Sequence, residues 1–255
     1  MKTPFKQERL DHVSNMIEFL RSEYKNSENH HIYIPQTCNL VPKRYQKTYR
    51  LSPGEQSIGI VIKSDQMGHK NFGGHTPPLA ALHMMLELAM LHPFDSLNAG
   101  LNWPDDVVVN HKAIATLFTE AVIEQGKIVG ILAIVTMHLN NVYAFSNEYY
   151  HTKASARVVT EEEVDESKYV ASFLKKLEEM HAVWEIKQYP QLYTEWKAKQ
   201  AYLNETITFF HNIGLVMRGQ ILDFLSSGNM ILHDENGKNH TVPYLQIQEY
   251  AQKNR

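Results

Sequence analysis

Two long apolar segments constrain the fold more than any other feature of the sequence. Residues 79–91 (LAALHMMLELAML) combine strong helix formers with apolar side chains nearly all round the helix, and such a helix has to be buried between layers. Residues 127–139 (KIVGILAIVTMHL) lack the alternation of a half-exposed strand, which indicates a strand covered on both faces. Together the two segments predict an α+β fold in which helices flank a mixed β-sheet.

Shorter patterns predict the elements before and between these segments. Apolar residues at helical spacing predict an amphipathic helix over residues 6–24 that rests on the main body: Leu10, Val13, Ile17, Leu20 and Tyr24. Residues 32–34 and 58–63 are rich in β-formers and predict strands. Residues 101–122 read as two strands around an Asn110–His111 turn.

The second half of the chain predicts helices followed by short strands. The acidic run 161–166 indicates the start of a helix, because negative charge is favoured at a helix N-terminus, and the apolar spacing continues to about Lys187. A second short helix holds Leu192, Tyr193 and Trp196. From about Leu203 onward, short strands separated by turns predict a small antiparallel barrel.

These patterns give the expected domain organisation. The main domain covers residues 1–200 and includes an N-terminal helical extension over 1–30. A small barrel domain covers residues 201–255.

Composition excludes several classes of function. A chain of 255 residues can bury a full core, and its formal net charge of −3 gives no basic footprint for nucleic acid. No apolar run reaches the length of a membrane span, and the charged N-terminus is unlike a signal peptide. The single cysteine, Cys38, excludes an intrachain disulfide and a Cys-rich zinc site. We therefore expect a cytoplasmic protein without nucleic-acid or membrane partners.

The 14 histidines raise the question of a metal centre. The sequence has no His-Glu-x-x-His motif, and His30, His31, His69 and His75 could come together only through folding. Histidines without a ligand pattern are more often ordinary surface or core residues. On the sequence alone, no metal site is expected.

Two local motifs point to chemistry, and each has a plainer alternative. The glycine loop Gly68–Gly74, in a glycine- and proline-rich stretch, could wrap a phosphate with backbone N–H groups and add charge from Lys70, or it is an ordinary loop. Trp103–Asp106 (WPDD) either positions two carboxylates before a strand or forms a turn with an Asx cap. Lys112, just beyond the Asn110–His111 turn, is either a functional cation or a solvated hairpin lysine.

The order of these landmarks resembles the biotin–protein ligase family, within the wider biotin/lipoate ligase superfamily. The resemblance covers about residues 30–250 and no single motif is decisive. Its landmarks are Gln36-Thr37-Cys38-Asn39 for the family's Asp-Ser-Thr-Asn helix start, Pro53-Gly54-Glu55 with IGIVIKSDQ for its "pEGtvviAdeQ" strand, Gly68–Gly74 for its Gly-Arg loop, Trp103–Asp106 for its Trp-Pro-Asn-Asp motif, and residues 107–117 and ILAIVTMHLN for the strands that follow.

The resemblance implies a fold and a reaction. The fold is a class II aminoacyl-tRNA-synthetase-like ligase core with a C-terminal SH3-like barrel. Members of the family condense biotin with ATP, in the presence of Mg²⁺, to biotinyl-AMP, release pyrophosphate, and pass biotin to a lysine of a biotin carboxyl carrier domain. The carrier lysine is the nucleophile, so the protein's own residues would position the reactants and neutralise charge.

Charged residues of the family are replaced in this chain. Its loop arginines fall on His69, Asn71 and Gly74, and only Lys70 keeps a cation in the loop. Asn cannot replace a planar bidentate donor. The family's catalytic lysine falls on Ala113, and Lys112 is one position early, which would turn its side chain to the other face of a regular strand.

The family's glycines are replaced as well. The positions where a ligand would lie against bare backbone fall on Thr116, Ile134 and Thr136, and the family's asparagine is His138. Packed interiors tolerate little added volume. We expect these side chains to fill part of the slot.

Two hypotheses follow. In the first, the protein is a divergent biotin–protein ligase in which Lys112 is the catalytic residue, Asp106 orients the pocket, and Lys112 and Lys70 offset phosphate charge. The ligand-binding residues would be Thr37, Cys38, Asn39, Gln66, Gly68, His69, Lys70, Asn71, Gly73, Trp103, Asp106, Thr116 and Thr136. Cys38, at the expected helix start, has either a lowered pKa or the role of a small buried hydrophobe. In the second, the protein is a non-catalytic descendant that acts as a binding or regulatory module, through homodimerisation along the sheet.

Overall fold

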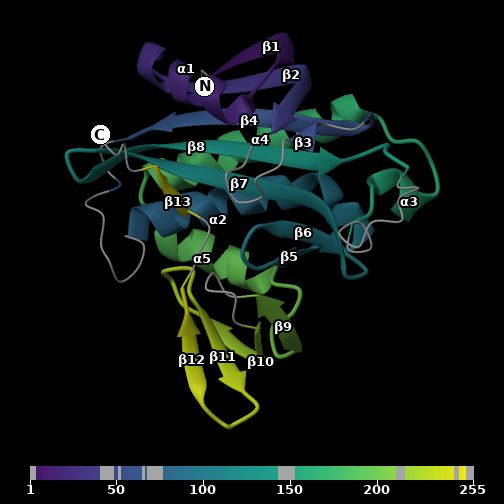
Figure 1. The fold of residues 1–255 in the computed structure, drawn as a ribbon, viewed down its shortest axis with the longest axis vertical. Coiled ribbons are helices and arrows are strands. Elements are labelled where there is room, and N and C mark those ends of the chain that lie inside the picture. The colour runs from purple at the N-terminus through teal and green to yellow at the C-terminus, as the bar shows by residue number, and fades with distance from the viewer. Residues whose placement is uncertain are drawn as a thin grey trace.

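A computed structural model describes most of the 255-residue chain. The described residues are 4–40, 49–50, 53–64, 67, 77–142, 153–210, 216–243 and 247–250. They form a large mixed sheet with helices on both faces and a smaller sheet toward the C-terminal end (Figure 1). The predicted α+β class, a mixed sheet flanked by helices, is confirmed.

The large sheet contains two parallel pairs among antiparallel ones. Its strands are β1 (Phe5–Val13), β2 (His30–Leu40), β3 (Tyr49–Arg50), β4 (Glu55–Lys63), β5 (Gly100–Asn102), β6 (Asp106–Val109), β7 (Lys112–Glu124), β8 (Lys127–His138) and β13 (Ile247–Tyr250). The order is β1-β2-β4-β8-β7-β6-β5, with β3 beside β2 and β13 beside β7. β1 runs parallel to β2 and β13 runs parallel to β7.

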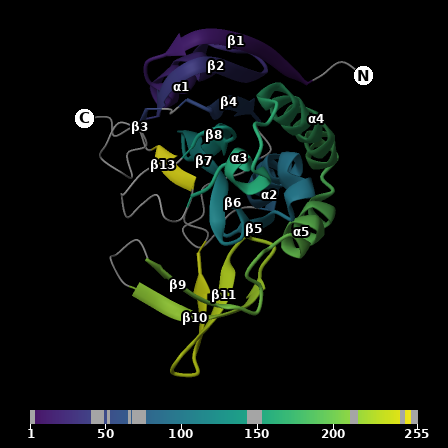
Figure 2. The same cartoon turned by 90° about the vertical axis from the view of Figure 1, so that its right-hand side faces the viewer.

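Helices cover the two faces of this sheet unequally. α2 (Pro77–Leu91), α4 (Glu166–Glu185) and α5 (Tyr189–Ala198) lie together on one face, as Figure 2 shows, and α1 (Met16–Asn26) packs on the other. Two short helices, η2 (His92–Leu97) and α3 (Ala156–Thr160), complete the described set. α2 is buried from Leu79 to Leu91, and β8 is buried from Gly130 onward, so both apolar segments take the predicted positions in the core.

The N-terminal prediction is wrong over its first half. Residues 5–13 form strand β1, and the helix begins only at Met16, where the Asn15 side chain accepts a hydrogen bond from the Glu18 backbone N–H (3.3 Å). Leu10 and Val13 happen to fit the helical spacing of Ile17, but they pair with β2. Pairing along most of a strand outweighs a weak local preference for helix.

Two helix starts also differ from the prediction. Residues 36–39, expected to begin a helix, lie inside strand β2. The acidic residues 161–165 precede α4 instead of forming its first turn, and Asp165 is the residue that caps Glu166–Glu185 by accepting from the Ser167 N–H (3.1 Å). Asp is a strong N-cap residue because its carboxylate accepts from otherwise unpaired N–H groups.

The small sheet contains β9 (Thr206–Phe210), β10 (Val216–Phe224), β11 (Met230–Asp234) and β12 (Asn239–Val242) in the order β12-β11-β10-β9. All of its pairs are antiparallel, as predicted. In the described part of the chain this sheet is open, so the expected closed SH3-like barrel is not confirmed. The next strand, β13, joins the large sheet.

No helix among the described residues is both long enough and apolar enough to cross a membrane.

Candidate functional site

A row of polar side chains crosses the large sheet on the face that α1 covers. Cross-strand pairing places Ser57 of β4 opposite Thr136 of β8, Thr136 opposite Thr116 of β7, Thr116 opposite Asp106 of β6, and Asp106 opposite Asn102 of β5. The chain neighbours of these five residues include members of the core cluster under α2: Ile58, Val135, Met137, Ala115, Leu117, Val107 and Leu101. Because successive side chains in a strand point to opposite faces, the five residues form one row on the α1 face, which we call the polar row.

Hydrogen bonds connect one end of the polar row. The Ser57 and Thr136 hydroxyls are 3.0 Å apart and buried. The Cys38 side chain, also buried, reaches the Ser57 side chain, and burial raises the pKa of this thiol to about 11 despite the opposing effect of that hydrogen bond. The Cys38 thiol and the Ser57 and Thr136 hydroxyls each carry one hydrogen, and two contacts join the three groups. Within this described group, one hydrogen therefore remains for a further acceptor.

A buried histidine–glutamate pair borders the polar row. His138 Nδ1 lies 2.8 Å from Glu55 Oε1, and the Asn141 side-chain amide donates to the same oxygen at 3.4 Å. Burial lowers the pKa of His138, although Glu55 acts in the opposite direction, so the imidazole is neutral near pH 7. Pairing of Glu55 with His138 and of Ser57 with Thr136 places both pairs on the same face.

Lys112 does not reach the polar row. It is exposed and pairs with Val109, whose side chain belongs to the α2 core cluster. Strand β7 carries a bulge here, because Ala113 pairs with Val108 while Ala115 pairs with Val107, which leaves Ile114 as the extra residue.

Another lysine lies beside the position that Lys112 was expected to fill. Lys153 forms an isolated parallel bridge with Ala113, and the following Ala154 N–H donates to the Ala113 carbonyl at 3.0 Å. Its ammonium is near enough to His138 for its charge to help lower the pKa of that imidazole, after the larger effect of burial. Lys153 therefore supplies a positive charge next to the polar row, beside Ala113 of β7 and near His138 of β8.

Of the other predicted residues, three lie outside the row. The Trp103 indole N–H donates to the Gly228 carbonyl (2.9 Å), so this side chain ties the main sheet to the small sheet. Thr37 is exposed, with its hydroxyl 2.8 Å from His12 Nδ1 of β1, and Asn39 pairs with Arg50 of β3. Thus four predicted residues are gathered at the row: Cys38, Asp106, Thr116 and Thr136.

The glycine-loop predictions are not tested. Gln66, Gly68, His69, Lys70, Asn71 and Gly73 lie outside the described residues. Their expected roles remain predictions.

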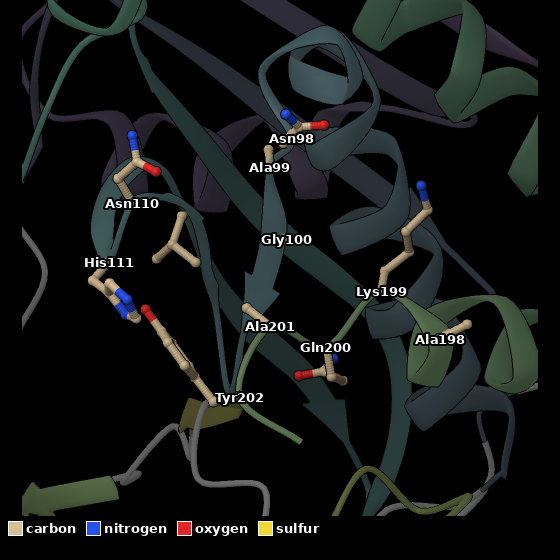
Figure 3. Close-up of a pocket in the computed structure, with 11 residues that line it drawn as sticks. Asn98, Ala99, Gly100, Asn110, His111, Ala198, Lys199, Gln200, Ala201 and Tyr202 are labelled. Atoms are coloured by element: carbon tan, nitrogen blue, oxygen red, sulfur yellow. The ribbon is translucent and has the colours of Figure 1, made fainter. Parts of the chain in front are cut away.

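An open pocket of about 410 Å³ lies near the β5–β6 end of the polar row (Figure 3). It is lined by Asn98, Ala99, Gly100, Val108, Asn110, His111, Ala198, Lys199, Gln200, Ala201 and Tyr202. The rings of His111 and Tyr202 stack with centroids 5.5 Å apart. Burial raises the pKa of Tyr202, and the charges of Glu205 and of Asp106, a member of the polar row, add to the effect.

Sequence reasoning missed five residues of this site: Ser57, Asn102, Glu55, Asn141 and Lys153. Glu55 ends the Pro53-Gly54-Glu55 landmark and Ser57 lies two residues further on, and their face could have been found by alternation back from the apolar Ile58 and Ile60. Lys153 follows a segment without periodicity, and its pairing with Ala113 is a long-range contact that no local signal reveals.

Comparison with known proteins supports the fold. No family model matches the chain, and no curated protein matches it in sequence. Among solved structures, biotin protein ligase from Aquifex aeolicus in complex with biotin and ATP is 15% identical and has a TM-score of 0.69, with 92% of this chain and 95% of that chain covered.

Two further structures agree. A biotin protein ligase-like protein of unknown function from a Silicibacter species is 12% identical, with a TM-score of 0.69 and 94% of each chain covered. Biotin protein ligase from Leishmania major in complex with biotinyl-5-AMP is 10% identical, with a TM-score of 0.57 and 93% and 98% of the two chains covered. The similarity extends over almost the whole of each chain, and the chain therefore has the fold of the biotin protein ligases.

Proposed function

We propose that the protein is a divergent acyl ligase of the biotin–protein ligase type. It would use ATP, with Mg²⁺, to activate a carboxylic acid of the biotin class and pass the acyl group to a lysine of a carrier domain. We further propose a cytoplasmic location, where the single thiol of Cys38 would stay reduced.

The observation that carries this proposal is the position of Lys153. The ligase resemblance puts the family's lysine at Ala113, and Lys153 bridges to the backbone of Ala113. A lysine that enters from a neighbouring segment would restore a positive charge beside the polar row. Without such a charge, bringing a carboxylate and a triphosphate together would be opposed by their repulsion.

The reaction follows from these groups. A carboxylate oxygen of the acid attacks the α-phosphorus of ATP, the bond to the β-phosphate oxygen breaks, and pyrophosphate leaves. The carrier lysine, as a neutral amine, then attacks the acyl carbon, AMP leaves with the electron pair, and the amine loses its proton. Lys153 would offset the negative charge in both steps, and the hydroxyls of Thr116 and Thr136 would orient the acid.

The threonines restrict the acid. Thr116 and Thr136 face each other across β7 and β8, and Thr136 is 6% exposed. A bicyclic ligand could not lie against bare backbone at these two positions, as the family's glycines would allow. The acid would therefore carry a polar head group that hydrogen-bonds to hydroxyls, or would sit farther from the strands than biotin does in the family.

The test is pyrophosphate release with biotin and related acids, ATP and Mg²⁺. Lys153→Ala should lower the rate at least about 100-fold, because one preorganised charge at a reacting oxygen is worth that much, and Lys153→Arg should restore part of it. Lys127→Ala removes an exposed lysine at the turn between β7 and β8, far along β7 from Ala113. This control variant should leave the rate unchanged. Loss of activity in Lys112→Ala with full activity in Lys153→Ala would overturn the assignment.

The second candidate is a non-catalytic binding or regulatory module that forms a homodimer along the sheet. The filled glycine positions at Thr116 and Thr136 favour it, since they reduce the space for an adenylate without harming the fold. Calorimetry separates the two candidates. Binding of an acid without pyrophosphate release supports the module, whereas binding together with release supports the ligase.

A further inference from the structure

Folding brings three metal-ligating side chains together between the start of β2 and helix α4. His30 stands at the start of β2, and His181 and Glu185 lie one turn apart on α4. One ligand atom from each of the three lies within 4.8 Å of those of the other two. This group, which we call the histidine cluster, contains none of the residues of the polar row.

The spacing in the histidine cluster follows from helix geometry. Residues four apart share one face of a helix, and His181 Nε2 lies 3.7 Å from Glu185 Oε1. His30 approaches from the strand, with its ring centroid 4.9 Å from that of His181 and the planes at 67°. Phe5 packs against both imidazoles, with centroid distances of 5.5 and 4.9 Å.

His181 carries a polar atom that lacks a hydrogen-bond partner. Its Nε2 is buried, and no described residue forms a hydrogen bond with it. A buried nitrogen without a partner destabilises the folded state. A cation between His181, His30 and Glu185 would accept this lone pair and remove the cost.

We propose that His30, His181 and Glu185 bind one Zn²⁺ ion, with water as the fourth ligand. Two imidazoles and one carboxylate, with one open position, are a common zinc donor set, and imidazole suits Zn²⁺ better than Mg²⁺ or Ca²⁺. Bonds of about 2.05 Å in a tetrahedron place the ligand atoms on the order of 3.3 Å apart. The 3.7 Å separation of His181 and Glu185 is already close to this value.

His30 has to exchange one weak contact for the ion. The Lys63 backbone N–H donates to His30 Nδ1 at 3.2 Å. This N–H would lose its acceptor if the ring turned toward the metal. The ring stands at a strand end and is only partly buried, so it can turn. The carboxylate of Glu185 is 44% exposed, which gives the ion a route from solvent.

Bound zinc would join the start of β2 to the C-terminal half of α4. These elements belong to the sheet and to the helical layer, so the ion would act as a clip between two layers. The inference does not depend on the proposed ligase function, because the histidine cluster and the polar row share no residue.

The test is metal binding to the full chain, freed of any histidine tag and stripped with a chelator. Calorimetry with Zn²⁺ should show one site, and Co²⁺ should give the intense visible bands of tetrahedral coordination. Glu185→Gln and His181→Asn should each weaken binding at least about 100-fold, since losing a direct ligand costs at least as much as losing the groups that orient it. Zinc should raise the melting temperature of the unaltered protein and leave that of Glu185→Gln unchanged.

A matched control is His92→Asn. His92 is an exposed histidine that pairs with Asp95 at 2.9 Å, on a different element, and its loss should not change zinc binding. Glu185 is exposed, so Glu185→Gln should fold even if His181→Asn does not. The proposal fails if Glu185→Gln binds Zn²⁺ with unchanged affinity, if Co²⁺ shows only weak octahedral bands, or if His92→Asn abolishes the site.

Discussion

The ion pair between Arg21 and Glu120 should be the largest single electrostatic contribution to the position of α1. Arg21 Nε donates to Glu120 Oε1 and Arg21 Nη2 to Oε2, both at 2.8 Å. The side chains are 12% and 5% exposed. Glu120 lies on the same face of β7 as Thr116, four residues along, so the helix that this pair holds lies next to the polar row.

The cost of breaking the pair follows from burial. Arg21→Met keeps most of the side-chain volume but leaves the Glu120 carboxylate buried without its bidentate partner, and such a loss costs about 3–5 kcal/mol. Glu120→Gln keeps one acceptor and should cost about 1–3 kcal/mol. The double variant Arg21→Met with Glu120→Met removes both charges and should lie within about 1 kcal/mol of the unaltered protein, because replacing a buried pair by apolar groups is often neutral.

Urea unfolding at pH 7, followed by circular dichroism, measures these free energies, and the unaltered protein, Arg21→Met, Glu120→Met and the double variant form a double-mutant cycle. Arg9→Met, which removes an exposed arginine of β1, is the control and should change the stability by less than about 0.5 kcal/mol. A cost below about 1 kcal/mol for Arg21→Met, or a double variant as unstable as that single one, would refute the reasoning. The first result would mean that solvent reaches the Glu120 carboxylate and replaces the lost partner, and the second that packing, not charge, holds the helix.

Three other predictions concern single residues. Since burial raises the pKa of Cys38 to about 11, iodoacetamide should label it slowly at pH 8 in the native protein and rapidly in urea, and rapid native labelling would contradict its burial. Trp103→Phe removes the hydrogen bond to the Gly228 carbonyl (2.9 Å) and should cost about 1 kcal/mol, with faster proteolysis within residues 216–243 and unchanged cleavage elsewhere. His138 has a lowered pKa in the folded state, so its contribution to stability is complete above its unfolded pKa of about 6.5 and is lost as the pH falls below that value; His138→Gln should flatten the fall in melting temperature between pH 7 and 5, and an unchanged slope would show that other groups cause it.

The sequence pattern predicted correctly the elements that are completely buried and the turn whose conformation depends on its own two residues. The segment 79–91 had to be a buried helix because its residues are apolar except for His83 and Glu87, and residues 127–139 had to be a covered strand. The Asn110–His111 turn was predictable because both residues tolerate positive φ, and they adopt +50° and +63°.

The prediction failed where long-range pairing decides the conformation. Residues 5–13 are mostly exposed, and only their parallel pairing with β2 makes them a strand. The start of α1 was nevertheless marked, since Asn15 followed by Glu18 is a capping pattern. An apolar spacing that continued upstream concealed this signal.

The candidate site was predictable in its residue types but not in its geometry. Thr116, Thr136 and Asp106 were named from the order of motifs, and the strand register places them in one row. Lys112 and Lys153 could not be ranked from the sequence, because the face of a strand residue depends on every bulge between it and the reference point.

That bulge decides which lysine can serve the polar row. Without an extra residue, alternation back from Thr116 would put Ile114 and then Lys112 on the row's face. With Ile114 inserted, Ala113 takes the place beside Val108, and Lys112 turns to the face of Val109. Among the described residues, the segment that bridges to Ala113 places Lys153 beside it. A charge at this site can therefore come from a segment 40 residues away along the chain while the hairpin's own lysine stays in solvent. Deleting Ile114 would leave the pairs of Ala115, Ala113 and Lys112 with β6 as they are, so it should not bring Lys112 to the polar row.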